Sequence, residues 1–172
     1  MQNCGGKMKK MVEKALQEAF AGEGMAHMKY LIYASIAEKD GYKNMARLFK
    51  AIAYAELVHA TNHAKALGMI KDTKGNLMNA IKGELFEVEE MYPVYSEIAK
   101  MQNESNAIKS FHYAMEAEKI HAAMYEDAKN SIENDKDIDI GTIYICPVCG
   151  YTHIGSIEKC PVCGYDGKFE EF

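Results

Sequence analysis

Apolar side chains recur with the period of an α-helix over most of the chain. They repeat every three or four residues in four long stretches, which end at glycine or in short polar segments. This pattern predicts helices at residues 7–39, 43–67, 75–101 and 105–132. Long helices with short connections are typical of a bundle. The sequence therefore predicts a mainly α fold built on a four-helix bundle.

The pattern changes after the polar segment 134–137, which is typical of a solvated linker. The tail contains the sequence Cys-Pro-Val-Cys-Gly-Tyr twice, at 146–151 and at 160–165, among glycine and β-branched residues. So short a segment cannot bury an apolar core of its own, and a metal ion would supply the missing stability. We therefore expect two domains, a helical one at 1–137 and a small β-rich, metal-binding one at 138–172.

Four cysteines in the tail have the spacing of one tetrahedral metal site. The pattern C-x2-C-x10-C-x2-C offers four thiolates, and in a reducing compartment such pairs indicate a metal ion and not disulfides. Both iron and zinc fit this spacing. Iron would make the tail a one-electron carrier, and zinc would make it a structural ribbon. The predicted ligands are Cys146, Cys149, Cys160 and Cys163. The fifth cysteine, Cys4, is expected to be an incidental thiol.

A glutamate interrupts the apolar stripe of each predicted helix. In the first, second and fourth helices, Glu23, Glu56 and Glu118 stand where an aliphatic residue is expected. The third helix has three glutamates at three-residue steps, so two neighbours can point inward together: Glu84, Glu87 and Glu90. A buried unpaired carboxylate costs several kcal/mol, whereas a domain is stable by only about 5–15 kcal/mol. Bound cations would neutralise such a group of carboxylates.

Two histidines indicate which cations are bound. The pairs Glu56-x-x-His59 and Glu118-x-x-His121 each place a carboxylate and an imidazole on one side of a helix. Two such pairs, with one glutamate from each of the other two helices, are the ligand set of ferritin-like dinuclear bundles. Several carboxylates with one imidazole per metal suit iron or manganese better than structural zinc.

Charge and composition exclude several classes of function. The net charge is −5 and Arg47 is the single arginine, the opposite of the balance in a nucleic-acid-binding protein. Residues 1–14 lack the apolar segment of a secretion signal. The longest stretch without charge, 140–157, is too polar to span a bilayer. We therefore expect a cytoplasmic protein without nucleic-acid or membrane partners.

The helical domain and the cysteine repeat together resemble the rubrerythrin family over nearly the whole chain. The motifs are Ala19-Phe20-Ala21-Gly22-Glu23, Glu56-x-x-His59-Ala60, Gly83-Glu84, Glu87-x-x-Glu90-Met91-Tyr92-Pro93, Ala117-Glu118-x-x-His121 and the four cysteines. Rubrerythrins are non-haem iron peroxidases. Their di-iron centre reduces hydrogen peroxide to water with electrons from a rubredoxin-like FeCys4 centre, drawn from NAD(P)H through rubredoxin or a separate reductase. The resemblance implies the same role in oxidative-stress defence.

The resemblance also implies which residues hold the two irons. The expected ligands are Glu23, Glu56, His59, Glu87, Glu90, Glu118 and His121. One iron would move between His59 and Glu90 as its oxidation state changes. The expected catalytic residues are Glu23, Glu56, Glu90, Glu118 and Tyr30. Family dimers place the rubredoxin-like domain of one subunit near the di-iron site of the other, so a homodimer or larger homo-oligomer is expected.

Three side chains near this ligand set are expected to support it. Tyr30 lies on the same stripe as Glu23, and Tyr92 follows Glu90, so either phenol is placed to hydrogen-bond a bridging group. Glu84 is expected to lie outside the ligand set, in solvent or behind a ligand.

One connection departs from a ferritin-like bundle. The segment 68–75, between the second and third helices, is short for a chain that must cross the bundle. Either the crossover continues to Gly83, or the helices swap between subunits.

Three other functions share some of these sequence features. An iron-storing ferroxidase needs no built-in electron carrier, so the cysteine repeat argues against it. A zinc-ribbon interaction protein gives no reason for two Glu-x-x-His pairs. An oxidase that reduces O2 has the same centres and stays open, as does zinc in either site.

Overall fold

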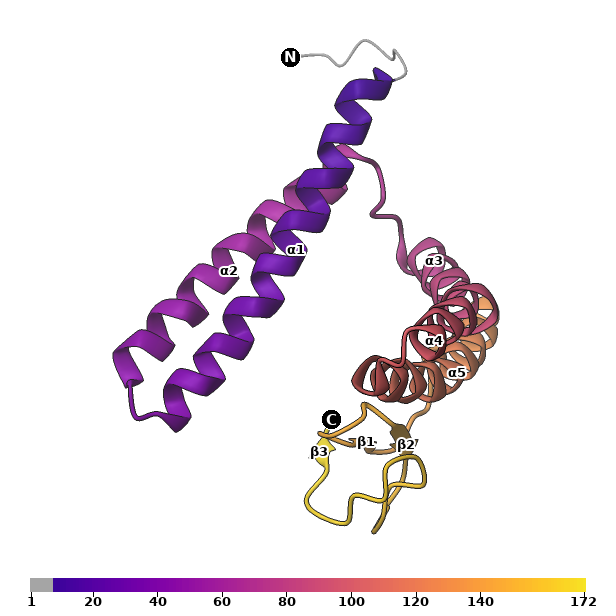
Figure 1. Cartoon of the computed structure of the whole chain (residues 1–172). Coiled ribbons are helices and arrows are strands. Elements are labelled where there is room, and N and C mark those ends of the chain that lie inside the picture. Colours follow the sequence, from indigo (N-terminus) through magenta and orange to yellow (C-terminus); the bar gives the residue numbers. More distant parts are fainter. Residues whose placement is uncertain (1–7) are drawn as a thin grey trace. The chain divides into compact units, whose positions relative to one another are not determined.

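The computed structural model describes residues 8–172 and forms two compact units (Figure 1). The first ends at Lys71, and the second runs from Asp72 to Phe172. Cys4 and the expected helix start at residue 7 lie outside the described residues. The domain boundary expected at residue 137 stays a prediction.

The first unit is a helical hairpin of α1 (Lys10–Lys39) and α2 (Lys43–Ala66), which lie side by side in Figure 1. Gly41 in the turn between them has φ +84°, a conformation that favours glycine. The residues buried between the helices are all small, so the two backbones approach closely: Ala34, Ala37, Ala46, Ala53, Ala60 and Ala64. Both predicted helices are confirmed to within a few residues.

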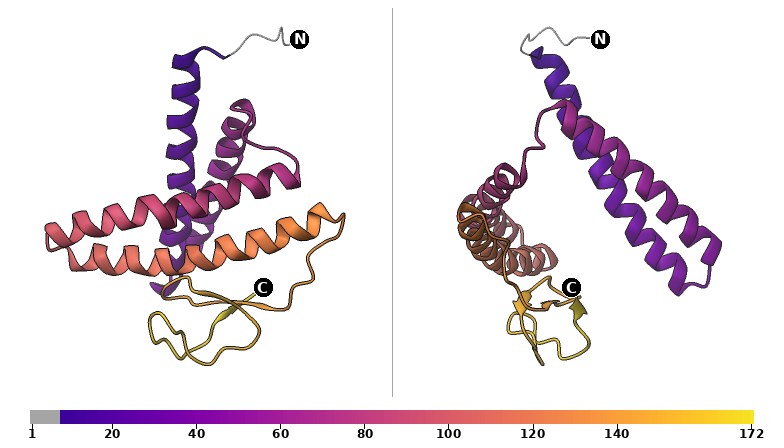
Figure 2. Two further views of the ribbon diagram at one scale, coloured as in Figure 1. Left: turned by 90° about the vertical axis from the view of Figure 1, so that its right-hand side faces the viewer. Right: turned by 180° about the vertical axis from the view of Figure 1, so that it is seen from behind.

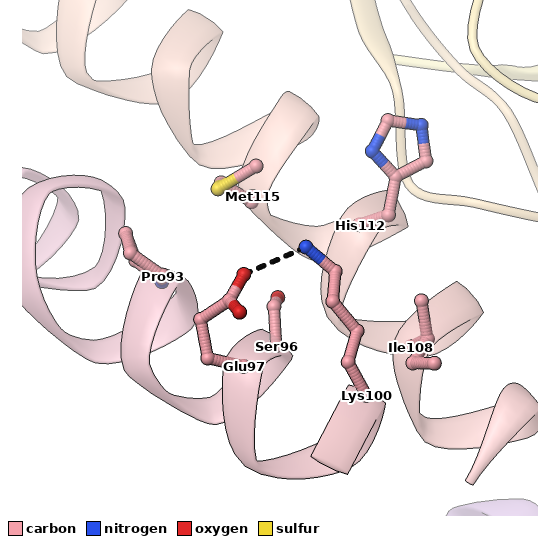
Figure 3. A pocket seen from close by; sticks show the side chains of 7 residues that line it. All are labelled: Pro93, Ser96, Glu97, Lys100, Ile108, His112 and Met115. Carbon is pink, nitrogen blue, oxygen red and sulfur yellow. Dashed lines mark hydrogen bonds and ion pairs between the residues drawn. The ribbon is translucent and has the colours of Figure 1, made fainter. Parts of the chain in front are cut away.

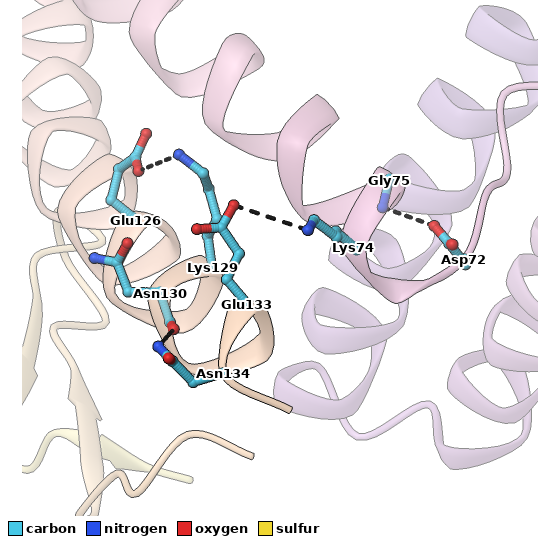
Figure 4. Close-up of polar contacts among 8 residues, drawn as sticks. All are labelled: Asp72, Lys74, Gly75, Glu126, Lys129, Asn130, Glu133 and Asn134. Atoms are coloured by element: carbon cyan, nitrogen blue, oxygen red, sulfur yellow. Dashed lines mark hydrogen bonds and ion pairs between the residues drawn. The ribbon is translucent and has the colours of Figure 1, made fainter. Parts of the chain in front are cut away.

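The helices of the second unit form an antiparallel pair. Its first arm consists of α3 (Thr73–Phe86), the π-helical turn η1 (Glu87–Met91) and α4 (Tyr92–Met101), which follow one another directly. The other arm is α5 (Ser105–Glu133). The Asp72 side chain accepts a hydrogen bond from the Gly75 N–H at 2.8 Å and so caps α3. Lys74 and Glu133 join the open end of the pair at 3.9 Å (Figure 4).

The start of α3 corrects one expectation. Because α3 begins at Thr73, the crossover does not continue to Gly83, and only residues 67–72 connect α2 to α3. The capping hydrogen bond from Gly75 to Asp72 gives the physical reason, since it satisfies a free N–H of the first helical turn at this early point.

The irregular turn η1 lies just before Pro93. Within it the Tyr92 N–H donates to the Glu87 carbonyl, five residues back, and not four as in an α-helix. Proline has no N–H and cannot continue the α-helical hydrogen-bond ladder, which favours a change of pattern at this point. Glu87 and Glu90, two of the expected ligands, both lie in η1.

The tail forms a small unit of strands, here called the four-cysteine module (residues 138–172). Its antiparallel sheet has the order β2 (Thr152–Ile154), β1 (Ile143–Ile145) and β3 (Glu170–Glu171). The core is made of cysteines and one aromatic ring: Cys146, Cys149, Cys160 and Phe169. In the left view of Figure 2, α5 lies between the arm formed by α3 and α4 and the strands of the module. Among residues 8–172, no helix is long and apolar enough to cross a membrane.

Candidate metal centres

The four cysteines meet at one point in the module. Their sulfur atoms lie within 4.8 Å of one another. Cys146 Sγ lies 3.6 Å from Cys163 Sγ, and Cys149 Sγ lies 3.4 Å from Cys160 Sγ. Four sulfurs at about 2.3 Å from a central ion stand about 3.8 Å apart in a tetrahedron. The site therefore has nearly the dimensions that a tetrahedral ion requires.

The two cysteine pairs have the same local backbone, as their repeated sequence predicts. The Gly150 N–H donates to the Cys146 carbonyl at 2.9 Å, and the Gly164 N–H donates to the Cys160 carbonyl at 2.9 Å. Both glycines have positive φ, +78° and +77°, which an L side chain rarely adopts. The glycine after each pair therefore folds the chain back over the sulfurs.

The thiols of the metal-free four-cysteine site differ in pKa, which is lowered for Cys160 and raised for Cys149 and Cys163. Burial acts to raise the pKa of Cys160, but the backbone N–H groups of Cys163 and Val162 outweigh it and lower the pKa to about 7. Burial raises the pKa of Cys149. Amide groups that point at sulfur stabilise the charged form, and a bound cation would deprotonate the remaining thiols.

The hairpin carries one cluster of carboxylates and imidazole. Glu23 comes from α1, while Glu56 and His59 come from α2, and their ligand atoms lie within 4.8 Å of one another. His59 Nδ1 lies 2.9 Å from Glu56 Oε2 and 3.7 Å from Glu23 Oε1. The structure thus brings together the three side chains of the first two helices that the sequence predicts as metal ligands.

The second unit carries a matching cluster. Glu84 of α3 meets Glu118 and His121 of α5, again with all ligand atoms within 4.8 Å. His121 Nδ1 lies 2.6 Å from Glu118 Oε2. Each unit therefore offers two carboxylates and one imidazole, with the histidine three residues after a glutamate in both.

Repulsion between carboxylates raises pKa values in and beside the second cluster. Burial, a hydrogen bond to Glu118 and the charges of Glu118 and Glu87 raise the pKa of Glu84 to about 7. Burial and the charge of Glu118 also raise the pKa of Glu87. Without a cation, one of these groups holds a proton near neutral pH. Such a group of carboxylates is suited to binding a cation that replaces the proton.

In the third predicted helix, the glutamate that lies in the cluster is not one of the two expected as ligands. Glu84, expected outside the ligand set, shares the cluster with Glu118 and His121. Glu87 is half-buried beside that cluster, since its pKa responds to both Glu118 and His121. Glu90 is exposed. The ligand roles of Glu87 and Glu90 stay predictions.

The two tyrosines lie in different surroundings. The Tyr30 ring packs near Phe49 and Tyr33, with centroid distances of 6.3 Å and 6.2 Å. Burial and the charges of Glu87, Glu118 and Glu84 raise the pKa of Tyr92, which places its phenol beside the carboxylates of the second unit. The supporting roles expected for both tyrosines stay predictions.

Comparison with known proteins shows the family to which the chain belongs. The sequence model of rubrerythrin matches residues 14–129. The chain belongs to the rubrerythrin family. Rubrerythrin-2 of Clostridium acetobutylicum is 49% identical over 156 residues, which cover 83% of this chain and 85% of that protein. Nigerythrin of Nitratidesulfovibrio vulgaris is 37% identical over 152 residues, which cover 80% and 74%.

A solved structure is also similar. Nigerythrin in its fully reduced, all-ferrous state matches with a TM-score of 0.55 and 31% identity, over 100% of this chain and 91% of that one. The mainly helical ferritin-like fold with a rubredoxin-like four-cysteine site is therefore confirmed. The carboxylate–histidine clusters and the four cysteines fit the metal centres of an oxidoreductase of the rubrerythrin family.

A groove between α4 and α5 lies outside these clusters. It has a volume of about 470 Å³ and is lined by Pro93, Ile108 and Met115, among others (Figure 3). The ion pair of Glu97 and Lys100, at 2.7 Å, belongs to its wall. None of the predicted ligands lines this groove, so it takes no part in the proposed chemistry.

Proposed function

We propose that this protein is a di-iron peroxidase that reduces hydrogen peroxide to water. The observation that supports it most directly is the pair of clusters, each with two glutamates and one histidine, in a chain that also carries a four-thiolate site. We propose one iron in the four-cysteine site and two irons held by Glu23, Glu56, His59, Glu87, Glu90, Glu118 and His121. Two irons, when bound, supply the two electrons that split the O–O bond.

The residues of the chain have distinct roles in this proposal. The carboxylates would balance the charge of the irons, and His59 and His121 would each supply an imidazole nitrogen. Reduction of one peroxide to two waters consumes two protons as well as two electrons. Glu84, which shares the second cluster with Glu118 and His121, would be a further ligand once a cation replaces its proton.

The four-cysteine module is the proposed electron entry. Its iron would accept electrons one at a time from rubredoxin or from an NAD(P)H-dependent reductase and pass them to the carboxylate centre. We further propose that the protein is cytoplasmic and acts as a homodimer or larger homo-oligomer in oxidative-stress defence.

The test is a visible spectrum of the anaerobically reduced protein before and after one equivalent of hydrogen peroxide. We expect ferric-thiolate and oxo-bridged diferric absorption to appear rapidly, and more rapidly than with O2. A faster reaction with O2 would favour an oxidase. Deposition of excess iron would favour a ferroxidase, and a colourless protein would favour a zinc-bound site.

A pair of variants makes this test specific. Glu118→Gln removes a ligand, and we expect its reaction with peroxide to slow by more than about 100-fold, since changes behind a metal ligand already cost about 10–100-fold. The four-cysteine absorption should remain. Glu126→Gln is the matched control, because Glu126 lies on the same helix and pairs with Lys129 at the same three-residue spacing (Figure 4). Equal rates for the two variants would contradict the proposed site.

A further inference from the structure

The imidazole of His121 has a partner on each of its two nitrogens. Nδ1 lies 2.6 Å from Glu118 Oε2, in the carboxylate cluster. Nε2 lies 2.8 Å from the hydroxyl oxygen of Thr152, which belongs to strand β2 of the four-cysteine module. A side chain 31 residues further along the chain therefore contacts a predicted metal ligand from behind.

The hydrogen bonds of Thr152 determine which nitrogen of His121 carries the proton. The Thr152 hydroxyl donates to the Gly150 carbonyl at 3.1 Å. A hydroxyl has a single hydrogen, so its oxygen acts as acceptor toward His121. His121 then donates from Nε2, and its Nδ1 presents a free lone pair toward Glu118, 2.6 Å away, when a cation lies between them or when Glu118 carries the proton. That is the tautomer in which Nδ1 can bind a metal ion.

The position of Thr152 is well defined by packing. Thr152 is only 4% exposed, and among residues 8–172 it is the one polar residue that is buried. A Cβ at Gly150 would lie 4.0 Å from Ala117 Cβ, so the turn after the first cysteine pair lies against α5 one residue before Glu118. A polar group buried in this way is normally kept for its hydrogen bonds.

We propose that Thr152 is the positioning residue of the carboxylate centre and its link to the four-cysteine module. It holds His121 in the Nε2–H tautomer, with Nδ1 directed at the metal position. It also completes a short path of bonds from Cys149 through Gly150 and Thr152 to His121. Electrons from the four-cysteine iron would reach the carboxylate centre along this path, a statement that rests on the proposed function.

The path lies within one chain. The resemblance to the family implied that the rubredoxin-like domain of one subunit serves the site of another. Here Gly150 and Thr152 contact Ala117 and His121 of the same chain. The module therefore has a contact with its own chain's ligand helix, whatever further contact a second subunit makes.

Three variants test the role of the hydroxyl. Thr152→Val keeps the shape of the side chain and removes the hydroxyl, while Thr152→Ser keeps the hydroxyl. Thr142→Val is the control, because Thr142 is an exposed threonine of the same module. All three should keep the four-cysteine absorption, which shows that the module is folded.

The first readout is independent of peroxide activity. ¹⁵N NMR of the full chain, with the carboxylate centre emptied and at a pH where the ring is neutral, reports the tautomer of His121. We expect a larger fraction of the Nε2–H form in the wild type, Thr152→Ser and Thr142→Val than in Thr152→Val, where the Glu118 carboxylate 2.6 Å away draws the proton to Nδ1. Fe(II) affinity at the carboxylate centre should fall about 10–100-fold in Thr152→Val alone.

The second readout follows the electrons. After one equivalent of peroxide, transfer from the reduced four-cysteine iron to the oxidised carboxylate centre should slow at least about 10-fold in Thr152→Val, in line with the loss of a partner behind a ligand. Tautomer, affinity and transfer rate equal to those of Thr142→Val would overturn the proposal. Equal losses in Thr152→Val and Thr152→Ser would also overturn it, because packing and not the hydroxyl would then be responsible. If the wild type failed to react with peroxide, the tautomer and affinity measurements would still decide the role of Thr152.

Discussion

At the scale of single residues, the second carboxylate cluster shows how neighbours of like charge raise the pKa of a glutamate. Glu84 differs from an ordinary surface glutamate because burial and the nearby Glu118 and Glu87 disfavour its ionised form. The same repulsion that raises its pKa is relieved when a cation binds. A proton and a metal ion therefore compete for this cluster, and pH controls both the metal affinity and the stability of the metal-free protein.

The stability of the metal-free protein is expected to fall as pH rises. The pKa of Glu84 is about 7 in the folded state against an ordinary value of 4.5, so the folded state binds this proton more tightly. The stabilisation is complete below the unfolded pKa and is lost as pH rises through about 7. Thermal unfolding in the presence of a chelator, followed by circular dichroism across this range, measures the effect.

A variant isolates the contribution of Glu84. Glu84→Gln cannot ionise, so its unfolding midpoint should be less dependent on pH and higher than that of the wild type above neutral pH. Glu116→Gln should follow the wild type, because Glu116 pairs with Lys119 at 2.6 Å and lies outside the cluster. Parallel pH profiles for Glu84→Gln and the wild type would show that another group is responsible.

At the scale of elements, the π-helical turn decides which side chains of the third predicted helix face α5. An α-helix advances about 100° per residue, so the extra residue of a π turn rotates everything after it relative to everything before it. Because of η1, the α3 residue Glu84 and the α4 residue Tyr92 both come close to Glu118. π turns of this kind occur often at functional sites.

Deletion of Glu89 tests the role of this turn. Removing one residue from η1 would restore a regular α-helix and keep the faces that α3 and α4 turn toward α5, because the five residues of a π turn rotate the chain about as far as four residues of an α-helix. We expect the variant to keep iron in both the carboxylate centre and the four-cysteine site, as measured by metal analysis and visible absorption. Glu89→Ala is the control, since it removes only an exposed side chain. Loss of iron from the carboxylate centre alone would show that the shape of the π turn itself is needed there.

At the scale of the whole molecule, the connection between the two units sets a limit on how a bundle can close. A ferritin-like bundle has one long crossover along its length. Helix α2 has 24 residues and is about 36 Å long, whereas the six residues 67–72 span at most about 22 Å. Of the two alternatives that the sequence left open, only the swap of helices between subunits is compatible with this length, and it stays a prediction.

A complementation experiment tests the swap. Glu56→Ala changes the hairpin, and Glu118→Ala changes the second unit. If each bundle combines the hairpin of one chain with the second unit of another, a mixed dimer has one bundle with both changes and one with none. Co-expression of the two variants should then restore iron in about a quarter of the sites, the value for random pairing in a two-fold dimer.

The matched control uses two variants of the same unit. Glu56→Ala with Glu23→Ala leaves every hairpin changed, so it cannot restore a site in either arrangement. Iron analysis and the reaction with peroxide are the measurements. If both mixtures remain equally inactive, each chain uses its own helices.

Features that depend on residues close together in the chain could be predicted from the sequence. Helical periodicity, the Glu-x-x-His pairs and the repeated cysteine pairs are all local, so the four-cysteine site and the trio of Glu23, Glu56 and His59 could be predicted from spacing. The remaining features depend on packing. Glu84 meets Glu118 and His121 because α3 packs against α5, and the contact of Thr152 with His121 joins residues 31 positions apart. Neither leaves a periodic signal in the sequence, because each depends on how separate elements pack together.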